Sequence, residues 1–245
     1  MRALAAQVRV ETSLTLRRGE SLLLTLGIPV AFLAFFSTVH VVATGTAKPA
    51  TFFVPGILAL AVMSTAMVSL GIATGFERGY RVLKRLGFTP LGRPRLLAAK
   101  TATIVVVELV QVVVLVAVGL ALGWRPIGAD PAGAVGLAAA AMVLASVAFA
   151  GIGLTLAGVL RAEVNLAAAN ALYLVLLLLG GMVVPLTTLP GALAHVAGVL
   201  PAAALSSALH AVLGTGTPVP LHSWVVLALW AIGAPGLAAA TFRWE

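Results

Sequence analysis

Between Val164 and Phe242 the chain contains no Asp, Glu, Lys or Arg residue. A surface in contact with water needs such residues, which make up about 25% of a typical soluble domain. Over all 245 residues only 9% are charged and 61% are hydrophobic. The uncharged segment must therefore lie in lipid, and the sequence predicts an integral membrane protein.

Six apolar segments are long enough to cross the hydrocarbon layer of a bilayer, which takes about 20 helical residues. Their continuous apolar runs lack the alternation of barrel strands, so we expect an all-α fold. We expect a single transmembrane domain over residues 1–245, with spans at 21–44, 52–75, 101–123, 132–160, 166–186 and 223–242.

The stretch between the last two expected spans, residues 187–222, is uncharged but is interrupted by Pro190, Pro201, Pro218 and Pro220. Two short helices are expected, at 190–200 and 202–213, each rising about 16–18 Å. Neither can cross about 30 Å of hydrocarbon. We therefore expect a re-entrant helical hairpin that enters the membrane from outside. One kinked seventh span is the alternative, and it would place the C-terminus outside.

Positive charge gathers on one side of the expected spans. The N-terminal tail, the loop after the second span, the loop after the fourth span and the C-terminal tail hold thirteen of the fifteen Lys and Arg residues, and the opposite loops hold only Lys48 and Arg125. Because Lys and Arg collect in cytoplasmic loops, we expect a multi-pass protein of the inner (plasma) membrane with both termini in the cytoplasm. Residues 1–20 are then cytosolic or interfacial. The net charge of +8 serves orientation, and nucleic acid is not an expected partner.

The largest charged segment, residues 76–100, holds seven of the fifteen basic residues. On a helix, residues 76–86 would place Phe76, Tyr80, Leu83 and Leu86 opposite a basic face. The pattern predicts an amphipathic helix that continues the second span into the cytosol and ends near Gly87 and Pro90. Its charge could serve topology alone, through contact with anionic membrane lipids, or it could contact a soluble partner.

The order of residues in this segment is specific. It runs through Glu77, Arg78, Lys84, Arg85, Leu86, Thr89, Pro90, Arg93 and Lys100. This order resembles the cytosolic connection of the type-two ABC exporter permeases, the six-span membrane subunits of drug, lipid and glycan exporters. The basic N-terminal tail, the six-span layout and the broken segment before the last span resemble that family too.

The resemblance implies that a short coupling helix docks on a cytosolic ABC ATPase and transmits its ATP-driven movement. The residues implied in this coupling are Glu77, Arg78, Arg81, Lys84, Arg85, Thr89, Pro90 and Arg93. It also implies two permease subunits, identical or related, that enclose a path and associate with two ATPase subunits.

Nucleotide chemistry is not expected in this chain. The phosphate-binding pattern Gly-x-x-x-x-Gly-Lys-[Ser/Thr] does not occur, so ATP and Mg²⁺ are expected on the partner ATPase. The chain has no Cys, and its four His show no metal-ligand spacing, so no cofactor or metal site is expected. Ser206 and His210 lack a Gly-x-Ser-x-Gly elbow and an orienting acid, so no catalytic residue is predicted.

Four polar residues inside the expected spans are candidates for the translocation path: Glu108, Gln111, Asn170 and Tyr173. Glu108 is the only acid inside a span, and Gln111 shares its helix face. An ionisable group at that depth should face the bundle interior or a wet cavity. Glu108 could equally tie the third span to a neighbouring helix, and for Asn170 and Tyr173 an interhelical hydrogen bond is the favoured alternative. Gly71-x-x-x-Gly75 and Gly119-x-x-x-Gly123 fit close helix packing.

The apolar interior predicts a lipophilic cargo, such as a drug in multidrug efflux and antibiotic resistance, or a lipid. A glycan path would have more aromatic residues. An ion-coupled secondary transporter is an alternative, but it would need more intramembrane carboxylates or matched broken helices. A membrane enzyme and an assembly subunit without transport are the remaining alternatives.

Overall fold

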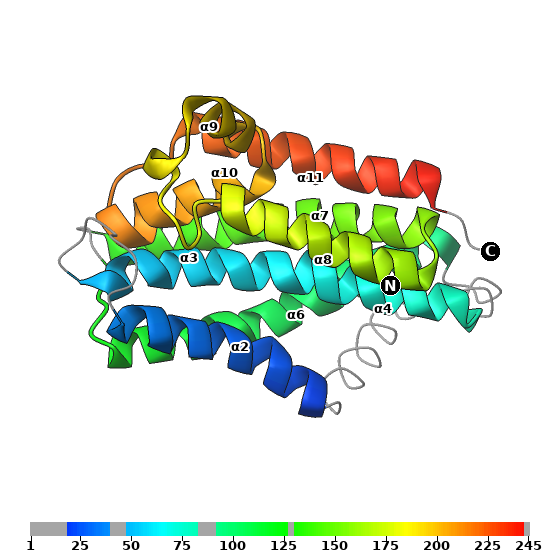
Figure 1. Ribbon diagram of the computed structural model, residues 1–245, viewed down its shortest axis with the longest axis horizontal. Helices are drawn as coiled ribbons and strands as arrows, with labels where there is room; N and C mark the ends of the chain where they lie inside the picture. The colour runs from blue at the N-terminus through cyan, green and yellow to red at the C-terminus, as the bar shows by residue number, and fades with distance from the viewer. Residues whose placement is uncertain (1–18, 40–47, 83–91, 127–129, 243–245) are drawn as a thin grey trace.

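The computed structural model describes residues 19–39, 48–82, 92–126 and 130–242, and of residues 19–24 and 92–98 only the backbone. All regular elements in these ranges are helices packed side by side (Figure 1). In chain order they are α2 Gly19–Thr38, α3 Pro49–Met63, η1 Ser64–Ser69, α4 Leu70–Gly79, α6 Gly92–Ala121, α7 Pro131–Val159, α8 Ala162–Leu179, η2 Leu186–Thr188, α9 Gly191–Gly198, α10 Pro201–Leu209, η3 His210–Thr215 and α11 Leu221–Thr241.

Local sequence explains where several helices begin. Proline occupies the first turn of α3, α7 and α10, where its missing N–H has no helical partner to lose. Asp130 caps α7 and accepts a hydrogen bond from the backbone N–H of Gly133 at 2.9 Å. Pro190 and Pro220 directly precede α9 and α11. Three of the four prolines that interrupt residues 187–222, Pro190, Pro201 and Pro220, thus mark helix starts.

Among the described residues, five helices are long and apolar enough to cross a membrane, or six if one bent pair counts as a span. The five are Pro49–Gly79, Ala99–Ala121, Pro131–Val159, Ala162–Leu179 and Leu221–Thr241. The apolar part of α2, Thr25–Thr38, is shorter, and the expected continuation of that span to residue 44 lies outside the described residues. The prediction of an all-helical membrane fold is confirmed within these ranges.

The rod formed by α3, η1 and α4 is the centre of the bundle. Nearly every residue of α3 is buried, including Val54 and Ile57, and η1 is a short π-helical segment within the same rod. Helices α2 and α6 lie on one side of it, and α7, α8 and α11 lie on the other (Figure 1). We call the end where α4 stops and α8 begins the α4 end, and the opposite end, which carries α9, the α9 end.

Helix α4 is shorter at its C-terminal end than expected. It ends at Gly79, Tyr80 caps it, and the backbone of Arg81 adopts a left-handed conformation with φ of 59°. The unbroken amphipathic helix expected over residues 76–86 is therefore wrong at Tyr80 and Arg81, although Val82 is again helical. Residues 83–91, and with them Leu83 and Leu86, lie outside the described residues.

A bent helix pair covers part of the α9 end. Helix α9 and the continuous Pro201–Thr215 helix meet at an angle of 87°. The carbonyls released at this bend find donors on α11: Nε2 of His222 lies 2.7 Å from the Gly198 oxygen, and Nε1 of Trp230 donates to the Val199 oxygen at 2.9 Å. The bend is thus held by side chains of another helix.

We expect Trp230→Phe to lower stability by about 1 kcal/mol, because it leaves the Val199 carbonyl without its indole donor. The measurement is the thermal midpoint of the detergent-purified protein. Trp224→Phe is the matched control, because it changes an α11 indole other than the one that donates to the Val199 carbonyl. Equal midpoints for the two variants would contradict a capping role for Trp230.

Candidate functional site

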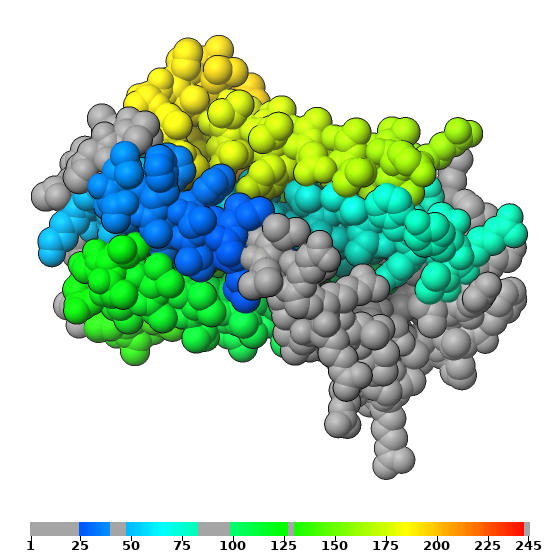
Figure 2. Space-filling view, turned by 60° about the horizontal axis from the view of Figure 1, so that its bottom comes forward, coloured from blue at the N-terminus to red at the C-terminus, as the bar shows by residue number. Residues whose placement is uncertain are grey.

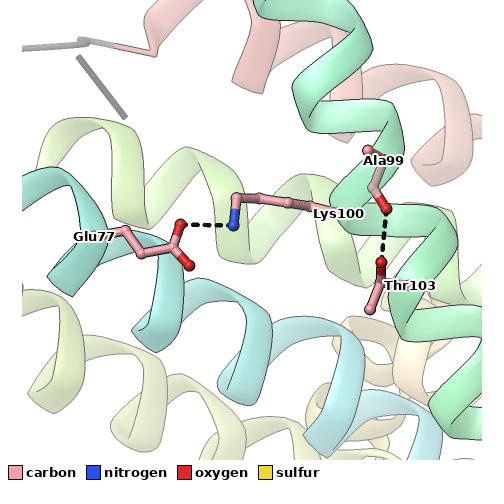
Figure 3. Close-up of polar contacts among 4 residues, drawn as sticks. All are labelled: Glu77, Ala99, Lys100 and Thr103. Atoms are coloured by element: carbon pink, nitrogen blue, oxygen red, sulfur yellow. Dashed lines mark hydrogen bonds and ion pairs between the residues drawn. The ribbon is translucent and has the colours of Figure 1, made fainter. Parts of the chain in front are cut away.

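The last turn of α4 and the first turns of α6 are joined by an ion pair. Nζ of Lys100 lies 2.6 Å from Oε2 of Glu77 (Figure 3). The Lys100 side chain is only 5% exposed, against 35% for Glu77. A buried ammonium group is costly without a counter-charge, so this pair fixes the entry of α6 against α4.

The neighbouring Arg78 side chain closes the C-terminal end of α7. Its Nη1 and Nη2 groups donate hydrogen bonds to the carbonyl oxygens of Gly158 and Leu160. The last carbonyls of a helix lack intrahelical partners and carry partial negative charge. The planar, forked guanidinium can satisfy two of them at once. Arg78 thus links α4 to the end of a helix eighty residues further along the chain.

Glycines bring the helices at this end into close contact. An ideal Cβ on Gly71 would lie 3.0 Å from the Gly153 oxygen, and one on Gly75 would lie 2.5 Å from Nδ2 of Asn165. Nδ2 of Asn165, on α8, donates to the Gly71 carbonyl at 2.9 Å, and Asn165 is fully buried. The packing predicted for Gly71-x-x-x-Gly75 is confirmed. The sequence analysis did not predict this contact of Asn165. The available signal was a polar Asn in an apolar run, a few residues after Arg161.

The second glycine pair behaves differently. Gly119 packs against Val54, where an ideal Cβ would lie 2.8 Å from Cγ2, so this half of Gly119-x-x-x-Gly123 matches the prediction. Gly123 lies beyond α6 with φ of +85° and has open space at its Cβ position. It therefore serves the turn before Trp124 and not helix packing.

The side of the α4 end that faces away from the bundle carries exposed residues from two elements. Tyr80 is 73% exposed, and Arg81, Arg161 and Glu163 are exposed as well. Figure 2 shows the cyan end of α4 and the yellow-green start of α8 projecting from the molecule. Of the other predicted coupling residues, Lys84, Arg85, Thr89 and Pro90 lie outside the described residues, and for Arg93 only the α6 backbone is described.

Glu108 and Gln111 lie inside the bundle, as expected for polar groups at that depth. Glu108 is hydrogen-bonded to the Ser146 hydroxyl of α7. The Gln111 amide accepts from Oγ1 of Thr65 at 2.9 Å and donates to the Thr25 carbonyl at 2.9 Å. These contacts join α6 to α7, η1 and α2.

Asn170 and Tyr173 lie elsewhere, on α8. Asn170 is exposed, and its Nδ2 donates to the Leu166 carbonyl of its own helix at 2.8 Å, while Tyr173 is half-buried. The structure therefore separates the four predicted path residues, with Glu108 and Gln111 in the interior and Asn170 on an outer face. No group of three or more His, Asp or Glu that could hold a metal ion occurs in the described part of the chain.

Comparison with known proteins gives one family. A family model described as ABC-2 type transporter matches residues 3–213, which is most of the chain. No curated protein matches this sequence.

The Gln111–Thr65 hydrogen bond gives a test of the interior contacts. In a double-mutant cycle of Gln111→Leu and Thr65→Val, we expect a coupling free energy of ~0.6 kcal/mol, and at most about 1.7 kcal/mol, as for other hydrogen bonds between membrane helices. The measurement is the unfolding free energy in mixed micelles. Asn170→Leu, on an exposed face, should leave that free energy nearly unchanged. Strictly additive effects of Gln111→Leu and Thr65→Val would refute the contact.

Proposed function

This chain belongs to the ABC-2 type transporter family, and from that premise we propose that it is the membrane subunit of an ATP-driven exporter of lipophilic molecules. Permeases of this family are multi-pass integral membrane proteins that pair with ABC ATPase subunits. The permease domain has no ATPase activity, and nucleotide binding lies in the ATPase partner. The match over residues 3–213 is the observation that carries the proposal.

We place the α4 end in the cytosol and propose six spans, namely the five long apolar helices and α2. The distribution of Lys and Arg supports this orientation, because the N-terminal tail, the 76–100 segment, Arg161 and the C-terminal tail hold all but two of them. The bent pair then forms a re-entrant hairpin on the outer side. The re-entrant hairpin is supported by the positions of its neighbours, because α8 ends and α11 begins at the same end of the bundle (Figure 1).

The coupling contacts with the ATPase are proposed for the segment that follows α4. Arg81 supports this assignment, because it is exposed at the α4 end beside Tyr80. Charge-assisted hydrogen bonds from basic residues suit a docking contact. The full set of residues proposed to take part in coupling is Glu77, Arg78, Arg81, Lys84, Arg85, Thr89, Pro90 and Arg93. Glu77 and Arg78 lie within α4 and contact other helices, so the proposed docking contacts are those of the residues after α4.

The path is proposed to lie between two permease subunits, on the side that carries α8. Asn170 supports this, since an exposed amide on an otherwise apolar membrane helix is costly in lipid and is better covered by protein. Tyr173 on the same helix would line the path with it. Glu108 and Gln111 are hydrogen-bonded between helices, so they would reach a path only when α6 separates from its neighbours. The few polar groups favour a lipophilic drug or lipid as cargo.

Charge reversal tests the coupling proposal. We expect Lys84→Glu with Arg85→Glu to lower retention of the co-purified ATPase subunit about tenfold, because each acid repels the acidic partner surface that the basic residues would attract. Arg125→Glu, at the α9 end, is the matched control and should leave retention unchanged. Full retention and full ATP turnover in the doubly reversed complex would contradict the proposed docking site.

A further inference from the structure

We infer that Arg78 is a positioning residue that carries the movement of the coupling segment to the α7–α8 corner, defined as Gly158 to Ala162. This inference rests on the proposed function, since it assigns the residue a place in the coupling between ATPase and membrane helices. Its basis is the direction in which the guanidinium points. Its guanidinium donates hydrogen bonds to two backbone carbonyls at the end of α7, those of Gly158 and Leu160.

Arg78 lies at the point where movement would enter the bundle. It is in the last turn of α4, one residue before Gly79, and the chain turns away at Tyr80 and Arg81. Any displacement of the segment beyond this turn therefore acts directly on the two helices that flank it, α4 and α6. A helix end transmits a displacement to its neighbours only where it is fixed to them.

The fixing contacts extend along α4 on the side that faces α7 and α8. Gly71 lies against the Gly153 backbone, Gly75 against Asn165, and an ideal Cβ on Gly79 would lie 3.7 Å from Cβ of Ala162. These glycines leave no space in which α4 could rotate past α7 or α8. Arg78 completes the series at the α7 terminus, where a charged group interacts favourably with the helix end.

The nearby Arg81 differs from Arg78 in what its surroundings allow it to contact. Arg81 is exposed, with its backbone turned out of the helix, and it is placed to contact a partner. Arg78 is partly buried and contacts α7. The two arginines therefore divide the coupling task, with Arg81 facing outward and Arg78 fixing α4 to the α7–α8 corner.

A disulfide between α4 and the α7–α8 corner can replace the Arg78 contact. The role of that contact can then be measured separately from docking of the ATPase. The chain has no Cys, so Gly79→Cys with Ala162→Cys adds a single defined pair. The 3.7 Å Cβ separation falls within the range of about 3.5–4.5 Å for disulfides. The experiment compares five proteins, each reconstituted in lipid nanodiscs with its ATPase subunits: wild type, Arg78→Gln, Arg78→Lys, the cysteine pair, and the cysteine pair with Arg78→Gln. Each is assayed for ATPase retention and ATP turnover, oxidised and after reduction.

Arg78→Gln should retain the ATPase subunit but lower the permease-dependent ATP turnover about tenfold, the equivalent of one charge-assisted hydrogen bond of ~1.4 kcal/mol. Arg78→Lys should give an intermediate rate, because an ammonium group lacks the fork that spans both carbonyls. In the cysteine-pair protein that keeps Arg78, oxidation should leave ATP turnover within about twofold of its reduced value. In the cysteine-pair protein with Arg78→Gln, oxidation should restore ATP turnover.

Four results would overturn the inference. Loss of ATPase retention in Arg78→Gln would make Arg78 a docking residue. Unchanged turnover in Arg78→Gln, or no rescue by the oxidised disulfide, would remove its positioning role. A strong loss of ATP turnover when the cysteine-pair protein that keeps Arg78 is oxidised would show that α4 and α8 must separate in each cycle. Failure of the proposed function is distinct, because then the wild-type chain would neither retain an ATPase subunit nor alter its turnover.

Discussion

A backbone carbonyl released by a helix end or bend within the lipid needs a donor from the protein itself, because lipid offers none. Several of the chain's polar side chains donate hydrogen bonds to such carbonyls. Arg78 serves the end of α7, His222 and Trp230 serve the bend after α9, and Ser206 donates to the Gly181 carbonyl at 2.9 Å. The polar side chains thus determine which helices are joined and where.

The α4 end and the bent pair at the α9 end use different chemistry. The α4 end has charged groups, namely Arg78 on carbonyls and the Glu77–Lys100 pair, whereas the bent pair uses the imidazole of His222 and the indole of Trp230. Outside the bent pair, the Arg125 guanidinium donates to the Leu120 and Trp124 carbonyls after the end of α6. Charged groups suit a boundary with water and a soluble partner. Uncharged donors suit a segment within the outer half of the membrane, as proposed for the bent pair.

Much of the fold followed from the sequence, since long uncharged runs specify helices in lipid and prolines specify where helices start. The close packing at Gly71 and Gly75 followed as well. The turn at Tyr80 and Arg81 did not, because a left-handed backbone is uncommon for a residue other than Gly or Asn. A helical wheel sorts residues by face but does not show what each face contacts, so it did not reveal that Arg78 bonds to the end of α7.

Long-range contacts account for the rest of what the sequence did not reveal. The carbonyls that Arg78 contacts lie on a helix that ends eighty residues later, and Asn165 bonds to a glycine ninety-four residues earlier. Local spacing predicted that Glu108 and Gln111 share a face, but not that Ser146 and Thr65 lie opposite them. Such pairings depend on how the helices are arranged, which periodicity alone does not determine.

The most direct test of the account is which side of the membrane the α4 end faces. Single cysteines at Tyr80, which is 73% exposed, and at Leu221, which is 77% exposed at the start of α11, can be labelled with a membrane-impermeant maleimide in vesicles of both orientations. The account predicts that Tyr80→Cys reacts only in inside-out vesicles and that Leu221→Cys reacts only in right-side-out vesicles. Labelling of Tyr80→Cys from the outer surface would contradict it.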